Sequence, residues 1–234
     1  MEIKHLVEGK VNKIWEKYKE FSDVSPLAVS DVPDNGIIFI GINPSLGEKD
    51  RLNLQKSKVK QIAFYTLPDN STNDIHPYFK KFIKVHEEVG LPWGHIDLLY
   101  IRETQQSKIN EMLKNEKGIQ FIYEQTRVTR EVIDAIIEKA NPKVFIVNNT
   151  LARGLLGRYK TKDGIFPNNI PENQTHWLDY MFEWNDDYGT FFLKDKNIPF
   201  FFSSMFTGQR ALDNGSFERL IWHINFVLKK LESK

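Results

Sequence analysis

The sequence contains no cysteine, and this absence excludes several kinds of chemistry together. Without thiols the chain forms no disulfide, holds no metal or iron–sulfur cluster through thiolates, and has no cysteine nucleophile. The sequence also lacks any apolar run of about 18 residues, the length that predicts a membrane span. The segment after Met1 does not resemble a signal peptide. We therefore expect a cytoplasmic protein that does not contact a membrane.

An excess of charge of one sign is missing as well. Lysine and arginine total 32, aspartate and glutamate total 31, and the formal net charge is +1. Non-specific affinity for nucleic acids usually draws on a broad basic excess. Any nucleic-acid site in this chain must therefore be a local patch.

Sequence signatures of metal and cofactor sites are also missing. None of the six histidines forms a pair at metal-ligand spacing with a nearby carboxylate. The sequence has no glycine-rich phosphate-binding fingerprint and no Gly-x-Ser-x-Gly elbow. We expect neither a metal nor a cofactor.

The sequence does contain enough apolar residues for one sizeable core. Of its 234 residues, 41% are hydrophobic and 13% are aromatic, which predicts one domain spanning residues 1–234. Short apolar runs alternate with segments of helical period. The expected strands cover residues 37–41, 95–101, 142–147 and 198–204. The expected helices cover residues 2–21, 77–89, 107–115, 119–139, 150–157 and 216–231.

This alternation predicts an α/β protein, because each crossover between parallel strands needs a helix. The expected architecture is a three-layer α/β/α sandwich around a central four-stranded, mostly parallel sheet. Residues 22–35 and 49–73 are interpreted as connections, apart from the apolar residues 62–65. Residues 159–196 are an aromatic-rich insertion that is expected to cover the edge of the core, with a hairpin turning at 185–187.

The carboxyl ends of the strands are the expected place for a ligand. Open α/β sheets bind ligands in the crevice beyond these ends. Polar residues follow each of the four expected strands or lie near its end, at Asn43, Asp97, Asn148 and Ser204. We expect the loops that begin at these residues to lie close together.

The loop Gly41-Ile42-Asn43-Pro44-Ser45 resembles the first motif of the uracil-DNA glycosylase superfamily. The resemblance is closest to the mismatch-specific uracil/thymine branch, whose motif reads Gly-Ile-Asn-Pro-Gly. Residues 141–147 and 151–157 are similar to the third strand and following helix of that fold, and residues 204–210 occupy the place of its second motif. The resemblance covers residues 37–228 without the insertion.

This resemblance implies hydrolysis of the N-glycosidic bond between a base and deoxyribose. Asn43 would orient the attacking water through its side-chain carbonyl, and Gly41, Ile42, Pro44 and Ser45 would form the base-binding loop. An amide is no general base at neutral pH, so catalysis would rely on positioning and electrostatics. The alternative interpretation of Asn43 is a helix N-cap, with Pro44 in the first turn.

The resemblance also assigns roles to the loop after the last expected strand. Ser204 stands where some branches carry a catalytic histidine, and its hydroxyl would donate to the developing base anion; alternatively, it only ends a strand. Thr207, Gly208 and Gln209 would contact a phosphate, and Arg210 matches the family's arginine. The loop lacks the proline that the family has there.

Asp97 is the largest departure from the family. Many relatives have an asparagine at this strand position, which both donates to and accepts from uracil, whereas a carboxylate only accepts. Asp97 would favour a base edge with adjacent donors, or would need a raised pKa to bind uracil. The alternative is an ion pair between Asp97 and Arg102.

Aromatic side chains are candidates for stacking on a flipped base. The first candidates are Phe64 and its neighbour Tyr65. Tyr78 or Phe79 lies where relatives also have aromatic residues, although core packing is the commoner use.

The predicted function is therefore that of a metal-independent DNA glycosylase without a cofactor. It would act as a monomer on DNA and excise a damaged or mismatched base, uracil-like or deaminated, flipped from the duplex. One alternative is a nucleic-acid or nucleotide-binding protein that keeps the fold but hydrolyses nothing. Another alternative is a hydrolase of a free nucleoside or modified base outside DNA.

Overall fold

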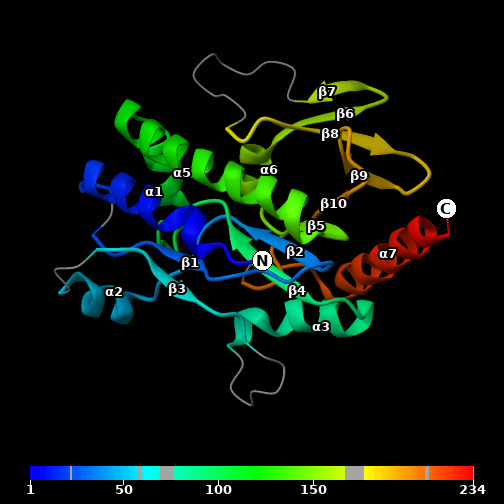
Figure 1. Cartoon of the computed structure of the whole chain (residues 1–234), viewed down its shortest axis with the longest axis horizontal. Helices are drawn as coiled ribbons and strands as arrows, with labels where there is room; N and C mark the ends of the chain where they lie inside the picture. The colour runs from blue at the N-terminus through cyan, green and yellow to red at the C-terminus, as the bar shows by residue number, and fades with distance from the viewer. Residues whose placement is uncertain (22, 57–59, 69–75, 167–176, 209–210, 234) are drawn as a thin grey trace.

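The computed structural model describes residues 1–21, 23–56, 60–68, 76–166, 177–208 and 211–233. Its centre is a mixed eight-stranded sheet with the order β4-β2-β5-β10-β9-β8-β6-β7, and a second, two-stranded parallel sheet pairs β1 with β3 (Figure 1). The strands are β1 Leu27–Val29, β2 Ile37–Gly41, β3 Ala63–Tyr65, β4 Trp93–Asp97, β5 Val144–Val147, β6 Gly157–Thr161, β7 Gly164–Phe166, β8 Tyr180–Asn185, β9 Thr190–Leu193 and β10 Pro199–Phe202. The helices are α1 Lys4–Lys17, α2 Glu48–Gln55, α3 Lys80–Val89, α4 Gln106–Met112, α5 Glu116–Ala135, α6 Thr150–Leu156 and α7 Asn214–Glu232, with a 3-10 turn η1 Pro77–Phe79 before α3 and a π turn η2 Ile136–Ala140 after α5.

Four neighbouring strands form the parallel half of the large sheet, and the sequence predicts all four. The second lies at Trp93–Asp97 rather than at the predicted residues 95–101. Strand β2 pairs in parallel with β4 and β5, and β5 pairs in parallel with β10. The register places Gly41, the last residue of β2, beside Asp97, the last residue of β4. The α/β class is therefore confirmed, and the predicted strand-end residues lie at one edge of the sheet.

The expectation of a four-stranded sheet is wrong, because the insertion extends the same sheet. Strand β9 pairs antiparallel with β10, and β8, β6 and β7 follow outward. The predicted hairpin is present: β8 and β9 are antiparallel, and the backbone nitrogen of Gly189 donates to the carbonyl of Asn185 across the turn. Phe182 is fully buried and packs on Phe200 of β10, which continues the core into the insertion.

The alternating sides of the strands face two separate apolar clusters. Ile38 and Ile40 of β2 belong to the cluster that includes residues of α1 and α5, which lie side by side. Ile37 and Phe39 belong to the cluster on the other face, with residues of α3 and α7. This follows from the period of two along a strand. Helices therefore cover both faces of the parallel half (Figure 1).

Two segments expected to be connections contain regular structure. Strand β1 lies in the first, and α2 and β3 lie in the second. The strands β1 and β3 have three residues each, and they exist because they pair with each other across more than 30 residues of sequence. The N-terminal helix is also shorter than expected and ends at Lys17.

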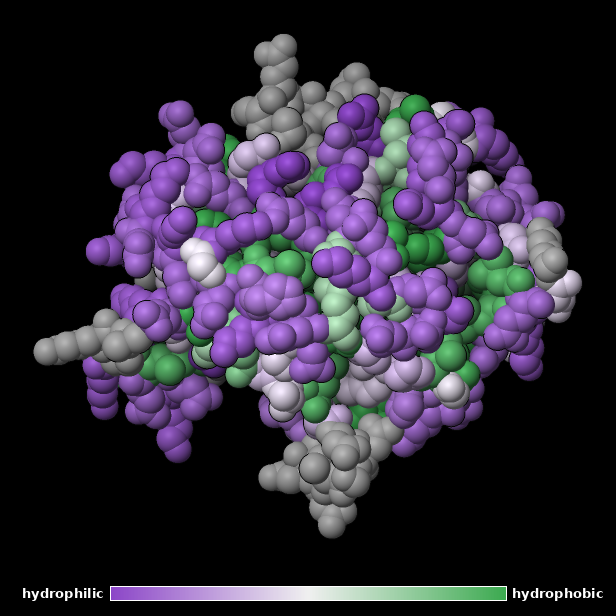
Figure 2. Space-filling view, in the orientation of Figure 1, coloured by the Kyte–Doolittle hydropathy of each residue, from purple (hydrophilic) through white to green (hydrophobic). Residues whose placement is uncertain are grey.

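The surface is mainly polar on the face that Figure 2 shows. Hydrophilic residues cover most of this face, and hydrophobic residues are visible in scattered areas between them. Within the described part of the chain, no helix combines the length and the apolar character that crossing a bilayer requires.

Candidate active site

A cavity of about 300 Å³ lies at the carboxyl ends of β2 and β4. We call it the strand-end cavity. Its lining comes from the loop after β2, from β4, from the small β1–β3 sheet and from the start of η1. The lining residues are Leu27, Asn43, Pro44, Ser45, Tyr65, His76, Tyr78, Phe79, His95 and Asp97. Its volume is at the lower end of the range for small-molecule sites, which are typically about 300–1,000 Å³.

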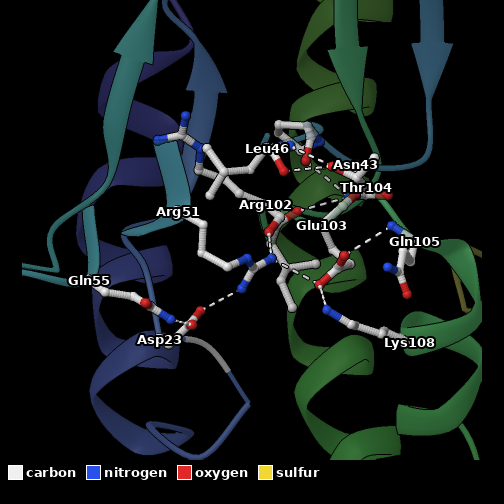
Figure 3. Close-up of polar contacts among 12 residues, drawn as sticks. Asp23, Asn43, Leu46, Arg51, Gln55, Arg102, Glu103, Thr104, Gln105 and Lys108 are labelled. Atoms are coloured by element: carbon white, nitrogen blue, oxygen red, sulfur yellow. Dashed lines mark hydrogen bonds and ion pairs between the residues drawn. The ribbon is translucent and has the colours of Figure 1, made fainter. Parts of the chain in front are cut away.

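Asn43 is held by its side-chain nitrogen. Nδ2 donates to the backbone carbonyls of Pro44 at 3.0 Å, Ile101 at 3.1 Å and Glu103 at 2.6 Å (Figure 3). Three acceptors around one nitrogen fix the orientation of the amide. The oxygen Oδ1 is then the end of the side chain without a hydrogen bond in the described part of the protein. The N-cap interpretation of Asn43 is wrong, since the next helix, α2, begins at Glu48 after Gly47.

The loop that carries Asn43 is bound to the loop after β4. The backbone nitrogen of Leu46 donates to Oγ1 of Thr104 at 3.1 Å, and the same hydroxyl donates to the carbonyl of Leu46 at 2.6 Å. The nitrogen of Glu103 donates to the carbonyl of Pro44 at 3.0 Å. These bonds hold the two strand-end loops in one arrangement (Figure 3).

An arginine on α2 supports this arrangement from outside. Arg51 contacts the carboxylates of Asp23 at 2.7 Å and Glu103 at 2.9 Å, and it donates to the carbonyl of Arg102 at 2.9 Å (Figure 3). Glu103 is 8% exposed and also lies 3.3 Å from Nζ of Lys108. The positive charges of Arg51 and Lys108 thus compensate a nearly buried carboxylate.

Asp97 fills the space that Gly41 leaves open on the adjacent strand. A Cβ atom at Gly41 would collide with Oδ1 of Asp97 and would lie 3.1 Å from Nε2 of His95. The Asp97 side chain is 10% exposed, and burial raises its pKa to about 8. The alternative interpretation, an ion pair between Asp97 and Arg102, is wrong, because these two residues form no ion pair in the described part of the protein. Nε of Arg102 is instead buried without a hydrogen bond among the described residues.

His95 connects two tyrosines beside this carboxyl group. The hydroxyl of Tyr65 lies 3.2 Å from Nδ1 and the hydroxyl of Tyr78 lies 3.3 Å from Nε2. Burial lowers the pKa of His95 to about 4, so the ring is neutral at pH 7 and donates to one hydroxyl while it accepts from the other. Nδ1 of His95 and Oδ2 of Asp97 are 4.0 Å apart. With a neutral ring and a protonated carboxyl group, this approach is no ion pair.

Both tyrosines are kept neutral by the same surroundings. Burial, followed by the proximity of Asp97, raises the pKa of Tyr65 and of Tyr78. A hydrogen bond with Asn148, the residue after β5, acts in the opposite direction on the pKa of Tyr78. Asn148 is 4% exposed, and its Oδ1 has no hydrogen bond in the described part of the chain.

The structure brings some of the predicted site residues together. Asn43, Pro44, Ser45 and Asp97 all line the strand-end cavity, and Gly41 lies directly behind Asp97. Ile42 is buried in the core on the side of α1 and α5. The roles predicted for these residues stay predictions.

Other predicted residues lie outside the cavity lining. Phe64 packs against the core, with Nζ of Lys4 5.7 Å from its ring centre, whereas its neighbour Tyr65 enters the cavity. Ser204 is exposed and follows β10, which is separated from β2 by β5. Thr207 and Gly208 continue that loop. Gln209 and Arg210 lie outside the described residues.

The sequence interpretation missed His95 as a member of the site. His95 and Asp97 are two residues apart on one strand, so their side chains point to the same side. This spacing of two residues is present in the sequence and indicates a shared side of the strand. Leu27 and His76 carried no signal, since the first comes from a strand three residues long and the second from the end of a connection.

Comparisons of the chain with protein-family models, curated proteins and solved structures find no match. Among the described residues, no group of three or more histidine, aspartate or glutamate side chains is arranged to hold a metal ion.

Proposed function

We propose that this protein is a DNA glycosylase that hydrolyses the N-glycosidic bond of a damaged or mismatched base flipped from DNA. The observation that carries the proposal is the anchoring of Asn43 beside a cavity at the carboxyl ends of β2 and β4. The resemblance of residues 41–45 to the first motif of the uracil-DNA glycosylase superfamily supports it. The substrate is a uracil-like or deaminated base, and the protein acts as a monomer in a three-layer fold of that superfamily.

Asn43 positions the attacking water in this mechanism. Its Nδ2 contacts three backbone carbonyls, so Oδ1, which has no hydrogen bond to a described residue, accepts one from the water. The amide does not remove the proton, because it is no base at neutral pH. The bond between the sugar carbon and the base breaks as the water oxygen bonds to that carbon, and the proton that the water loses passes through solvent and balances the proton that the departing base anion gains. Its contribution is orientation, with water held in line with the sugar carbon as positive charge develops on the ring.

The base enters the strand-end cavity in this proposal. The aromatic rings of Tyr65, Tyr78 and Phe79 offer flat apolar surface for a ring, and Ser45 and Asp97 offer polar contacts at its edge. No lysine or arginine belongs to the described lining, which suits an uncharged base rather than a phosphate.

In this proposal Ser204 donates to the departing base, and the rest of the loop after β10 contacts the DNA backbone. Ser204 is exposed and outside the cavity lining. Its predicted hydrogen bond to the departing base is tested by Ser204→Ala. Base release that is unchanged in this variant removes that role and leaves the assignment of Asn43 intact.

Base release from defined oligonucleotides tests the proposal. Labelled duplexes carry one uracil, one thymine opposite guanine, one hypoxanthine or one xanthine, and abasic sites are detected by alkaline strand cleavage. The proposal expects cleavage of at least one substrate. It fails if no base is released under conditions in which a control glycosylase works.

A second candidate is a nucleic-acid-binding protein that does not hydrolyse its ligand. The place of Ser204 outside the cavity lining favours it, because the predicted hydrogen-bond donor to the departing base is then missing from the lining. Binding to abasic or single-stranded DNA that weakens with salt, without turnover, would support this candidate. Turnover of free deoxyuridine without DNA would instead support a nucleoside hydrolase.

A further inference from the structure

The carboxyl group of Asp97 lines the strand-end cavity, and among the described residues its nearest basic neighbour is His95, 4.0 Å away. Its side chain is 10% exposed and lines the cavity. Within the described part of the chain, no hydrogen bond to its oxygens is found, and no lysine or arginine lines the cavity. A buried polar group without a partner is costly, and ligand sites are where such groups persist.

The groups that face Asp97 leave it uncharged at neutral pH. From its own strand, His95 lies 4.0 Å away and is neutral, because burial lowers its pKa to about 4. Tyr65 of β3 and Tyr78 of η1 carry neutral hydroxyls, Asn43 lies on the loop after β2, and Tyr100 lines a small void on the other side of Asp97. His76 lies on the exposed rim. Burial without an ion-paired cation raises the pKa of Asp97 to about 8.

A neutral carboxylic acid presents one donor beside one acceptor. This pair complements a ring edge that carries a donor next to an acceptor, as in the N–H and C=O of a cyclic amide. Because the proton is able to sit on either carboxyl oxygen, the ring edge is accepted in either order. An ionised carboxylate has no donor and opposes the ring carbonyl with a negative charge.

We propose that Asp97 binds the ligand as a neutral carboxylic acid and selects heterocyclic bases with a hydrogen-bond donor adjacent to an acceptor. This inference rests on the proposed function, in that the ligand of the cavity is a base. It adds a specificity-determining residue and a pH limit: binding weakens as Asp97 loses its proton, above about pH 8. Because a neutral carboxyl group accepts the donor and acceptor of a base in either order, other lining groups must determine which order is bound.

Titration of the full chain with two methylated bases tests this inference without requiring catalysis. The probes are 1-methyluracil, which keeps the N3 proton beside O4, and 1,3-dimethyluracil, which lacks that proton. Affinity is measured by NMR titration from pH 6 to pH 9.5 for the wild-type protein and for Asp97→Asn. The asparagine variant is the matched control, because an amide keeps a donor and an acceptor at every pH, and ionisation of the probe itself affects both proteins equally.

The expected result has two parts. At pH 7 the wild-type protein binds 1-methyluracil at least about tenfold more tightly than 1,3-dimethyluracil, as expected for a lost hydrogen bond of about 1.4 kcal/mol or more. Above about pH 8 its affinity for 1-methyluracil falls about tenfold per pH unit relative to that of Asp97→Asn.

Three results would overturn the inference: equal affinity for the two probes, the same pH profile in both proteins, or no binding of either probe. Failure of the proposed function looks different. Selective, pH-dependent binding without any base release from oligonucleotides would overturn the glycosylase proposal and leave the role of Asp97 standing.

Discussion

At the scale of single residues, the site contains polar side chains that neighbouring backbone groups hold in one position. Asn43 is held through Nδ2, and Asp97 occupies the space beside a glycine. In both cases backbone geometry sets the place of the side chain, and an oxygen is left for a ligand. Such preorganisation is what positional catalysis requires.

Gly41 is predicted to be essential for the position of Asp97. In Gly41→Ala the added methyl group collides with Oδ1 of Asp97 and approaches His95, so one or both must move. Overpacking of this kind costs about 1–3 kcal/mol in the free energy of unfolding. Thermal unfolding of the purified variant measures it.

Gly154 provides the control for this substitution. It lies in α6, and a methyl group added there would meet no other atom within 4 Å, so Gly154→Ala should stabilise the protein by about 0.5–1 kcal/mol. Equal effects of the two substitutions would contradict the account of Gly41.

At the scale of elements, helix α2 and the loop after β4 hold the Asn43 loop from outside. Arg51 is the connection, because it contacts Asp23, Glu103 and the carbonyl of Arg102. Helix α2 has no buried residue, so this polar network rather than apolar packing attaches it.

Loss of Arg51 is therefore predicted to destabilise the protein measurably. In Arg51→Ala the nearly buried Glu103 loses one of its two cationic neighbours, which should cost about 1–3 kcal/mol. The exposed pair of Arg158 and Asp179 is the control, and Arg158→Ala should change stability by at most about 0.5 kcal/mol. Urea denaturation measures the free energy of unfolding of both variants. An equal loss in the two would show that the contacts of Arg51 stabilise the protein no more than an exposed ion pair does.

The elements that the sequence predicts are those with a strong local pattern. Three of the four parallel strands, β2, β5 and β10, are short apolar runs, and helices such as Glu116–Ala135 and Asn214–Glu232 show a clear apolar period. Strands β1 and β3 escape prediction because three residues carry no period, and their pairing joins distant segments. The added strands of the insertion escape prediction for a related reason: only the β8–β9 hairpin has a local turn signal.

The same reasoning separates the predicted from the missed site residues. Asn43 and Asp97 stand at strand ends, where topology alone brings them together. Phe64 and Tyr65 are successive residues of β3 and point to opposite faces, so the sequence alone does not decide which ring enters the cavity. The pairing of His95 with two tyrosines depends on elements 17 and 30 residues away in sequence.

At the scale of the whole molecule, one continuous sheet joins the parallel half to the insertion. Phe182 of the insertion packs against Phe200 and Phe202 of β10, so the two halves share a core. We predict one cooperative folding unit rather than a domain with an independent appendage.

Phe182→Ala tests this prediction. Removing a fully buried phenylalanine should cost about 3–5 kcal/mol, and fluorescence and far-ultraviolet circular dichroism should report one common transition at a lower temperature. Phe166 is 43% exposed, and Phe166→Ala is the control, with an expected change of at most about 0.5 kcal/mol. Two separate transitions in Phe182→Ala would contradict the shared core.

The central claim is that Asn43 orients the water that hydrolyses a glycosidic bond. The most direct measurement compares single-turnover rates of base release for the wild-type protein, Asn43→Ala and Thr104→Ala on the duplex that the wild-type protein cleaves fastest. Thr104→Ala loosens the same loop by removing the Leu46 contacts, but it leaves the Asn43 amide in place. We predict that Asn43→Ala loses about 100-fold or more of the rate, as for other positioning groups, while Thr104→Ala loses less than about tenfold. Equal rates for Asn43→Ala and the wild-type protein, with both variants folded, would contradict the claim.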